Sequence, residues 1–248
     1  QSILPREFTL DNYVEALGHS MTVSSIRNSL LFSSLAVLFN IVLGVTIAFM
    51  VVRSTIKFRG LLDALAMLPL AVPGIVMAFG YLAISIDLSR LPTVKNSTFL
   101  KTLLDVQTNP TLFLVIAYGV RRLPYMVRSA VAGLQQTSVT LEEASANLGA
   151  SPLITIKRIT IPLILANLIA GAMLAFAFSM LEVSDGLMLA QNQDYWPITK
   201  TIYELFQLIG TGKYVASALG VWAMAFLGIT ILGASLILGK KLCAIFRV

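Results

Sequence analysis

The chain has few side chains that could perform catalysis, and they are widely separated. Its one histidine is His19 and its one cysteine is Cys243. It contains no His-Glu-x-x-His pattern and no Cys-x-x-Cys pair, so the sequence indicates neither a metal site nor a nucleophile with an adjacent base. The phosphate-binding pattern G-x-x-x-x-G-K-[ST] is absent as well. We therefore predict that the chain is not an enzyme and that it carries no cofactor and no metal.

A few charged residues could still act on a ligand. Glu182 and Asp185 are three residues apart and share a face if a helix continues through them. Such carboxylates either bind a cation or solvate a helix end, and we favour the second interpretation. Arg121 and Arg128, with Arg122 beside the first, lie deep in an apolar segment and must face protein or water. They could line a path for an anion, or they could reach the membrane surface and contact other protein, which we favour.

The elements that must position these residues are membrane helices. Of the 248 residues, 57% are hydrophobic and 12% are charged, whereas a soluble domain has about 25% charged residues. Each of the four longest uncharged runs exceeds the roughly 20 residues with which a helix crosses a bilayer. These runs contain 25, 23, 23 and 26 residues and follow Arg27, Asp63, Arg158 and Lys213 in turn. Their apolar residues do not alternate as in a membrane β-barrel, so we predict an all-α, polytopic membrane helix bundle.

We expect a single transmembrane domain over residues 1–248 with five membrane-spanning helices. Pro69 and Pro73 should bend or break the second helix, because each lacks a backbone N–H and crowds the preceding turn. Asn109 and Pro110 fit the cap and the first residue of the third helix. The predicted spans are residues 25–52, 61–86, 110–134, 162–181 and 214–239.

Two amphipathic helices are predicted outside the spans. Near the N-terminus, the pattern TLDNYVEALG indicates a short helix that Gly18 ends. After the fourth span, Pro197 can begin a helix and Gly210 can end it. The apolar face of this second helix would comprise Ile198, Ile202, Leu205, Phe206 and Ile209. Such a pattern is typical of a helix that lies at the membrane interface.

The distribution of basic residues predicts the orientation of the spans. One set of connecting segments holds nine Lys and Arg in 51 residues, and the other holds seven in 83. The first set comprises 53–60, 128–161 and 240–248, and the second comprises 1–27, 87–110 and 182–213. Short basic loops stay in the cytoplasm, so we expect the N-terminus outside and the C-terminus in the cytoplasm. The net charge of +6 reflects this bias and not a nucleic-acid partner. Because Gln1 is followed by no signal-peptide pattern, we expect the downstream part of a longer polypeptide.

The segment TLEEASANLGASPLITIKRITIPLI over residues 140–164, which carries four charged residues, joins the third and fourth spans. Thr140 with Glu143 three residues later fits a capping box, which begins a helix. Gly149 suits the left-handed position that ends one. We therefore predict a short cytoplasmic helix over residues 141–148, followed by a sharp corner.

One face of this short helix carries Leu141, Ala144, Ser145 and Leu148. A protruding helix with an acidic start and a ridge of small and apolar residues can be bound by a cytoplasmic partner. It can equally be a connecting loop, and the physical argument alone leaves both open.

The same residues resemble a known signature. Permease subunits of binding-protein-dependent type I ABC importers carry the EAA signature, which is Glu-Ala-Ala, three residues, Gly, nine residues and Ile-x-Leu-Pro. This chain has Glu143-Ala144-Ser145, Gly149 and Ile159-Thr160-Ile161-Pro162 at those spacings, departing at Ser145 and Ile161. The chain therefore resembles that family over essentially its whole length, since the family core has five spans with this loop between the third and the fourth.

The resemblance implies that residues 141–148 are a coupling helix that docks on a dimer of cytoplasmic ABC ATPases. It also implies a second permease half, fused or separate, a periplasmic or lipoprotein substrate-binding protein, and a place in the bacterial inner membrane. Glu143 would meet basic groups of the ATPase, and Pro162 would begin the span that moves. The residues implied in coupling are Leu141, Glu142, Glu143, Ala144, Ser145, Leu148, Gly149, Ile159 and Pro162.

For the substrate, the stretches MLPLAVPGIVMAFGYL, VIAYGVRRLPYMVRS and GKKLCAIFR most resemble permeases of the ferric-iron type. These often fuse two halves in one polypeptide, and this chain would be the second half. Glu182 and Asp185 would then be candidates to receive Fe³⁺. Relatives that import phosphonates, polyamines, thiamine or sulfate have similar sequence stretches, so these substrates remain alternatives. From another class, an ion-coupled secondary transporter would need ionisable groups inside the spans and often an inverted repeat; apart from the arginines, the sequence shows neither.

Overall fold

The chain is built from helices. The structure, a computed structural model, describes residues 9–245, and it describes the side chains of all of these except residues 234 and 237–245. Cys243 therefore lies outside the described side chains. Within the described range the chain forms helices and connections without a β-strand, which confirms the predicted all-α class.

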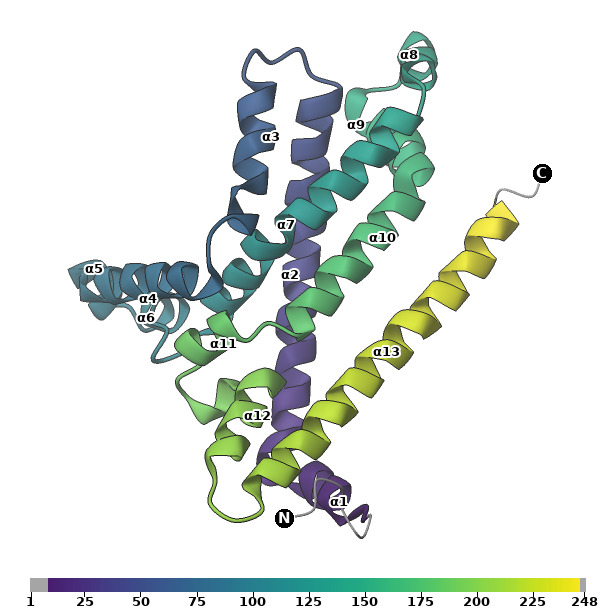
Figure 1. Cartoon of the computed structure of the whole chain (residues 1–248). Coiled ribbons are helices and arrows are strands. Elements are labelled where there is room, and N and C mark those ends of the chain that lie inside the picture. Colours follow the sequence, from purple (N-terminus) through teal and green to yellow (C-terminus); the bar gives the residue numbers. More distant parts are fainter. Residues whose placement is uncertain (1–8, 246–248) are drawn as a thin grey trace.

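The helical segments are arranged as a tilted bundle with a lateral arm (Figure 1). In chain order they are α1 Asp11–Gly18, α2 Ser20–Val52, α3 Arg59–Met67, η1 Leu68–Leu70, α4 Gly74–Arg90, α5 Pro92–Lys95, α6 Thr98–Leu104, α7 Thr111–Gln136, α8 Val139–Asn147, α9 Pro152–Thr155, η2 Ile156–Thr160, α10 Ile161–Met180, α11 Ser184–Leu189, η3 Gln193–Tyr195, α12 Ile198–Gln207 and α13 Gly212–Ile245.

Three helices in the described residues are long and apolar enough to cross a membrane. They are Ser20–Val52, Pro152–Met180 and Gly212–Gly233, and a bent pair of helices makes a fourth candidate if it is counted as one span. Their outer surfaces expose large apolar side chains such as Leu38, Val42 and Ile229. Such surfaces are unfavourable in water and are expected against lipid.

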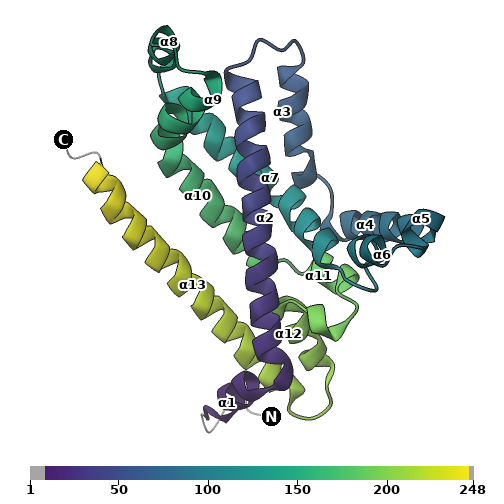
Figure 2. The same cartoon turned by 180° about the vertical axis from the view of Figure 1, so that it is seen from behind.

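α7 lies in the middle of the bundle, packed between α2 and α10 (Figures 1 and 2). The helices approach closely where glycines face larger side chains: a Cβ on Gly44 of α2 would lie 2.5 Å from Cγ of Met126 of α7. The helix agrees with the predicted third span but begins one residue late, because Pro110 is its cap. Asn109 still stabilises the start, since its Oδ1 accepts a hydrogen bond of 3.0 Å from the backbone N–H of Thr111.

The second predicted span, over residues 61–86, is a broken pair of helices. α3 and the 3₁₀ segment η1 make an angle of 100° with α4, so the chain turns out of the bundle. Pro69 cannot donate a backbone hydrogen bond, and Pro73 is extended with a ψ of 137° before Gly74 begins α4. The break at these prolines was predicted and is confirmed. The helices α4, α5 and α6 form the lateral arm that Figures 1 and 2 show beside the bundle.

Pro162 was predicted to begin the fourth span, and this prediction is wrong. The helix is continuous from Pro152 to Met180, and a π-helical turn over Ile156–Thr160 precedes the proline. In this turn the N–H of Ile161 bonds to the carbonyl of Ile156, five residues back. The wider turn accommodates the missing proline N–H without ending the helix.

α1, α12 and the start of α13 pack together at the end of the bundle opposite α8 (Figure 1). Gly18 ends α1 as predicted, and His19, to which no role was assigned, caps α2 by accepting a hydrogen bond of 3.4 Å from the N–H of Met21. α12 follows the predicted Pro197, but its predicted apolar face is partly wrong. Ile198 and Leu205 are buried against the start of α13, whereas Phe206 is exposed. Ile209 is exposed because it lies beyond the end of α12 at Gln207.

Candidate functional site

The predicted coupling helix is present as α8, at one end of the molecule (Figure 1). The predicted capping box is wrong: Ser138, and not Thr140, caps the helix, and its Oγ accepts a hydrogen bond of 3.2 Å from the N–H of Thr140. Thr140 therefore lies inside the first turn, and Glu143 has no capping position to bond to. The start of the helix falls two residues earlier than the sequence pattern predicted.

The predicted corner at Gly149 is confirmed. Gly149 has a φ of +83°. Its N–H bonds to the carbonyl of Ala146 at 2.9 Å, and the N–H of Ala150 bonds to the carbonyl of Ser145 at 3.1 Å. This pair of bonds is a Schellman motif, which satisfies the last carbonyls of a helix and fixes the direction in which the chain leaves it.

A groove of about 610 Å³ lies between α8 and the start of the α9–α10 helix. Leu148 at its rim is 89% exposed, and Leu141 is 46% exposed. Seven of the nine residues predicted for coupling lie in the groove lining or form its corner. The lining comprises Leu141, Ala144, Ser145, Leu148, Ala150, Ile154, Arg158, Ile159, Pro162 and Leu163. An apolar groove with protruding leucines can bind the apolar surface of another protein.

The side chains of the remaining two predicted coupling residues, Glu142 and Glu143, lie in different surroundings. Glu143 is exposed. Glu142 faces the protein, where its Oε1 lies 3.2 Å from Nε of Arg53 and accepts a hydrogen bond of 3.3 Å from Oγ1 of Thr160. Ser145 is buried below the groove, and its Oγ lies 2.9 Å from Oγ1 of Thr155. The predicted face is therefore not uniformly free for a partner.

The candidate pathway residues Arg121, Glu182 and Asp185 form a buried charge cluster. Nε of Arg121 lies 3.2 Å from Oδ2 of Asp185 and 3.5 Å from Oε2 of Glu182, and Arg122 forms an ion pair with the same Glu182 oxygen. Glu182 does not solvate a helix end as we had favoured, because it is 6% exposed and Asp185 is fully buried. Burial, and then the charge of Glu182, raise the pKa of Asp185, which lies past the end of α10, to about 6.

The cluster joins α7 to the break before α4 and to the start of α11. The sequence pattern did not predict these contacts. A Cβ on Gly74, the first residue of α4, would lie 2.8 Å from Nη2 of Arg121 and 2.8 Å from Oγ of Ser184. The guanidinium therefore fills the space between α7, the break before α4 and the start of α11. Arg122 also donates a hydrogen bond of 3.0 Å to the carbonyl of Phe178.

Arg128 is separate from this cluster. Its Nη2 lies 3.2 Å from Oδ2 of Asp63 on α3, and both side chains are partly exposed. Arg121 and Arg128 share the helix α7, as predicted, but they bind different elements. Among the described residues, no group of three or more His, Cys, Asp or Glu side chains could hold a metal ion.

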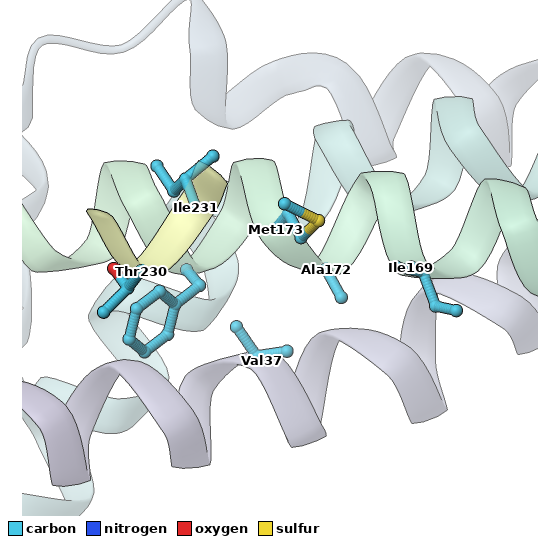
Figure 3. Close-up of a pocket in the computed structure, with 7 residues that line it drawn as sticks. Val37, Ile169, Ala172, Met173, Thr230 and Ile231 are labelled. Atoms are coloured by element: carbon cyan, nitrogen blue, oxygen red, sulfur yellow. The ribbon is translucent and has the colours of Figure 1, made fainter. Parts of the chain in front are cut away.

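A further cavity of about 370 Å³ lies between α2, α10 and α13 (Figure 3). Thr230 is the one polar residue among the described side chains that line it; the others are Val37, Ile169, Ala172, Met173, Phe176 and Ile231. One hydroxyl cannot replace the hydration of an ion. The cavity therefore offers no site for a charged ligand.

Comparison with known proteins identifies relatives over most of the chain. A family model described as "Binding-protein-dependent transport system inner membrane component" matches residues 40–240. The molybdenum transport system permease protein ModB of Escherichia coli (strain K12) is 33% identical over 210 residues, which are 82% of this chain and 88% of that protein. The ferric transport system permease protein FbpB of Actinobacillus pleuropneumoniae is 30% identical over 179 residues, which are 71% of this chain and 24% of that protein.

The fold also matches a solved structure. A crystal structure of a bacterial alginate ABC transporter, in complex with an alginate pentasaccharide-bound periplasmic protein, contains a chain that superposes with a TM-score of 0.71. The two chains are 20% identical, and the match covers 92% of this chain and 82% of that one. At this identity the likeness concerns the fold alone.

Proposed function

Because the chain belongs to the family of binding-protein-dependent transport system inner membrane components, we propose that it forms half of the membrane pathway of an ATP-driven importer and that α8 docks on its ATPase. The chain is a multi-pass permease subunit of the inner membrane and not the subunit that hydrolyses ATP. The proposed partners are a dimer of cytoplasmic ABC ATPases, a second permease half, fused or separate, and a periplasmic or lipoprotein substrate-binding protein.

The observation that carries the docking proposal is the exposed groove at α8. Leu148 is almost fully exposed beside further apolar residues, and the Schellman motif at Gly149 fixes its position. Burying one leucine side chain contributes about 1.5–3 kcal/mol, so a partner that covers Leu148 gains appreciable affinity from this residue. Glu143, exposed at the outer side of the same helix, is proposed to meet basic groups of the ATPase.

We propose that residues 1–248 form one domain that crosses the membrane five times, through α2, the bent α3–α4 pair, α7, α10 and α13. The basic connection with Arg53 and Lys57 lies at the same end as α8, and α1 and α12 lie at the other end (Figure 1). Since basic loops stay in the cytoplasm, this arrangement supports a cytoplasmic α8, an outer N-terminus and a cytoplasmic C-terminus.

For Arg121, Glu182 and Asp185 we propose a role inside the permease. Their charges compensate one another within the cluster, and Arg121 also fills the space beside Gly74. These contacts support a structural role, in which the three residues hold α7 against the α4 and α11 segments and do not contact the substrate directly. Arg128, paired with Asp63, is proposed to fix α3 on α7.

Two substrates are candidates. Ferric iron follows from the sequence resemblance, and the similarity to a ferric transport permease supports it. A molybdate-like oxyanion is supported by the similarity to ModB, which extends over 88% of that protein. The ligand of the cognate binding protein distinguishes the two: calorimetric titration of that protein with Fe³⁺ and with molybdate should show one of them bound. Binding of a sugar or a polyamine instead would contradict both.

The docking proposal is tested by purifying the permease with its ATPase. Leu148→Asp places a charge in the groove and should abolish copurification of the ATPase. Ile209→Asp is the matched control, because Ile209 is a fully exposed aliphatic residue at the opposite end. It should leave copurification at the wild-type level. If Leu148→Asp retains the ATPase while the protein is folded, α8 is not the docking site.

A further inference from the structure

The side chain of Arg53 connects the end of α2 with α7 and α8. Arg53 caps the C-terminus of α2. Its Nη2 donates to the backbone carbonyl of Thr137 at 3.0 Å and lies 3.1 Å from Oγ1 of the same residue, while its Nε donates to Oε1 of Glu142 at 3.2 Å. Thr137 is the residue that ends α7, so one guanidinium holds the ends of two bundle helices and the first turn of α8.

The carboxylate of Glu142 extends this connection to the fourth span. The oxygen that accepts from Arg53 also accepts from Oγ1 of Thr160 at 3.3 Å. Thr160 is 3% exposed and ends the π turn that leads into α10. A single side chain of α8 therefore contacts α2 through Arg53 and α10 through Thr160.

The position of this contact fits transmission better than docking. The side chain of Arg53 is 9% exposed and that of Glu142 is 17% exposed, so little of the pair can reach a partner. A charge-assisted hydrogen bond in such a place fixes the relative position of the elements that it joins. Thr160 also lines a cavity of about 270 Å³, together with residues of α2 and α7 such as Phe49 and Leu134. The polar contact therefore bridges helices whose apolar packing at this level is incomplete.

We infer that Arg53 and Glu142 are positioning residues that transmit the movement of α8 to α2 and α10, with Thr160 as the contact to α10. This rests on the proposed function, in which a cytoplasmic ATPase binds the solvent-exposed side of α8. Glu142, which the family resemblance implied in coupling, acts from the side of α8 that faces the bundle. Loss of the pair should leave the ATPase bound and separate ATP hydrolysis from transport.

The test uses the complete transporter, with its ATPase and its binding protein, reconstituted in proteoliposomes. We expect Arg53→Gln and Glu142→Gln to copurify with the ATPase like the wild type. The number of substrate molecules imported per ATP hydrolysed should fall about tenfold, within the range of typical allosteric coupling factors. The double variant should be no worse than the more impaired single variant, because the two residues act through one contact. Asp87→Asn, in an exposed ion pair with Arg90 on the lateral arm, is the matched control and should leave the ratio unchanged.

Thr160→Val is a milder variant that removes the hydroxyl and keeps the shape of the side chain. It should lower the same ratio in the same direction, and it serves as the test if Arg53→Gln is not recovered in folded form. An unchanged ratio in Arg53→Gln, or in Thr160→Val in that case, would overturn the inference. So would loss of ATPase binding in Glu142→Gln but not in Arg53→Gln, because Glu142 would then contact the ATPase directly. Absence of the ATPase from the wild-type preparation would instead refute the proposed function.

Discussion

Gly149 offers the most direct test of the connection between the backbone at α8 and its proposed partner. It has a φ of +83°, and a Cβ built on it meets no heavy atom within 4 Å. The cost of Gly149→Ala is therefore conformational and not steric. For a residue with a Cβ, the left-handed conformation costs roughly 1–2 kcal/mol, which corresponds to about a 5- to 30-fold change in a two-state population.

The measurement is a titration of the purified permease with its ATPase in detergent. If docking requires the Schellman end of α8, the apparent dissociation constant rises in proportion to the lost population of that conformation. Gly149→Ala should therefore weaken ATPase binding by at most about 30-fold. The thermal unfolding of the bundle should change little, because α8 lies at its edge.

Two comparisons separate this explanation from others. Gly149→Asn should weaken binding less than Gly149→Ala, because asparagine adopts the left-handed conformation more readily although it is larger. A steric cause would give the opposite order. Gly210→Ala is the matched control, since Gly210 has a φ of +89° and equally open surroundings at the other end of the molecule. ATPase binding that is unchanged in Gly149→Ala, or equally weakened in Gly210→Ala, would refute the reasoning.

Three further predictions concern packing and charge, each measured by thermal unfolding of the purified protein in detergent. Gly44→Ala should destabilise the protein by about 1–3 kcal/mol, because its Cβ would meet Met126 at 2.5 Å, whereas Gly80→Ala, in open space, should not destabilise it. Glu182→Gln should cost about 3–5 kcal/mol by leaving buried arginine charge uncompensated, and Asp87→Asn, from the exposed pair with Arg90, should cost less than about 1 kcal/mol. Ser145→Ala removes the bond to Thr155 and should cost about 1 kcal/mol, and the exposed Ser24→Ala should have no measurable effect. Equal effects of a variant and its control would contradict the assignment of that contact.

Features encoded within a few residues were predicted well. The corner at Gly149 and the start after Pro197 depend on backbone preferences that act locally, and both are present. The start of α8 was placed at Thr140 in place of Ser138, because both residues are good helix caps. Glu142 pairs with Arg53, which is 89 residues away in the sequence. A pattern that extends over a few residues contains no information about such a contact.

The direction of the second span and the charge cluster could not be predicted for a similar reason. Pro69 and Pro73 predict a break, but the angle of 100° depends on what α4 packs against, which is α11. Glu182 and Asp185 do not share a helix face, contrary to the prediction, because α10 ends at Met180 and α11 begins at Ser184. Their partner Arg121 comes from 64 residues before Asp185. The sequence shows two arginines in one span and two carboxylates after another, and only their distances in the folded protein reveal that these four charges neutralise one another.

The π turn before Pro162 has a consequence for rotation about the helix axis. Each residue of an α-helix advances by about 100° around its axis, and a π turn holds one additional residue that does not contribute to this advance. Deleting one residue from Ile156–Thr160 would therefore convert this turn into regular α-helix and leave the groove of α8 facing in nearly the same direction relative to α10. Deleting one residue from the regular helix after Pro162 would instead turn everything before the deletion, including the groove, by about 100° relative to the rest of α10. The π turn thus allows this helix to hold one additional residue while α8 keeps its direction.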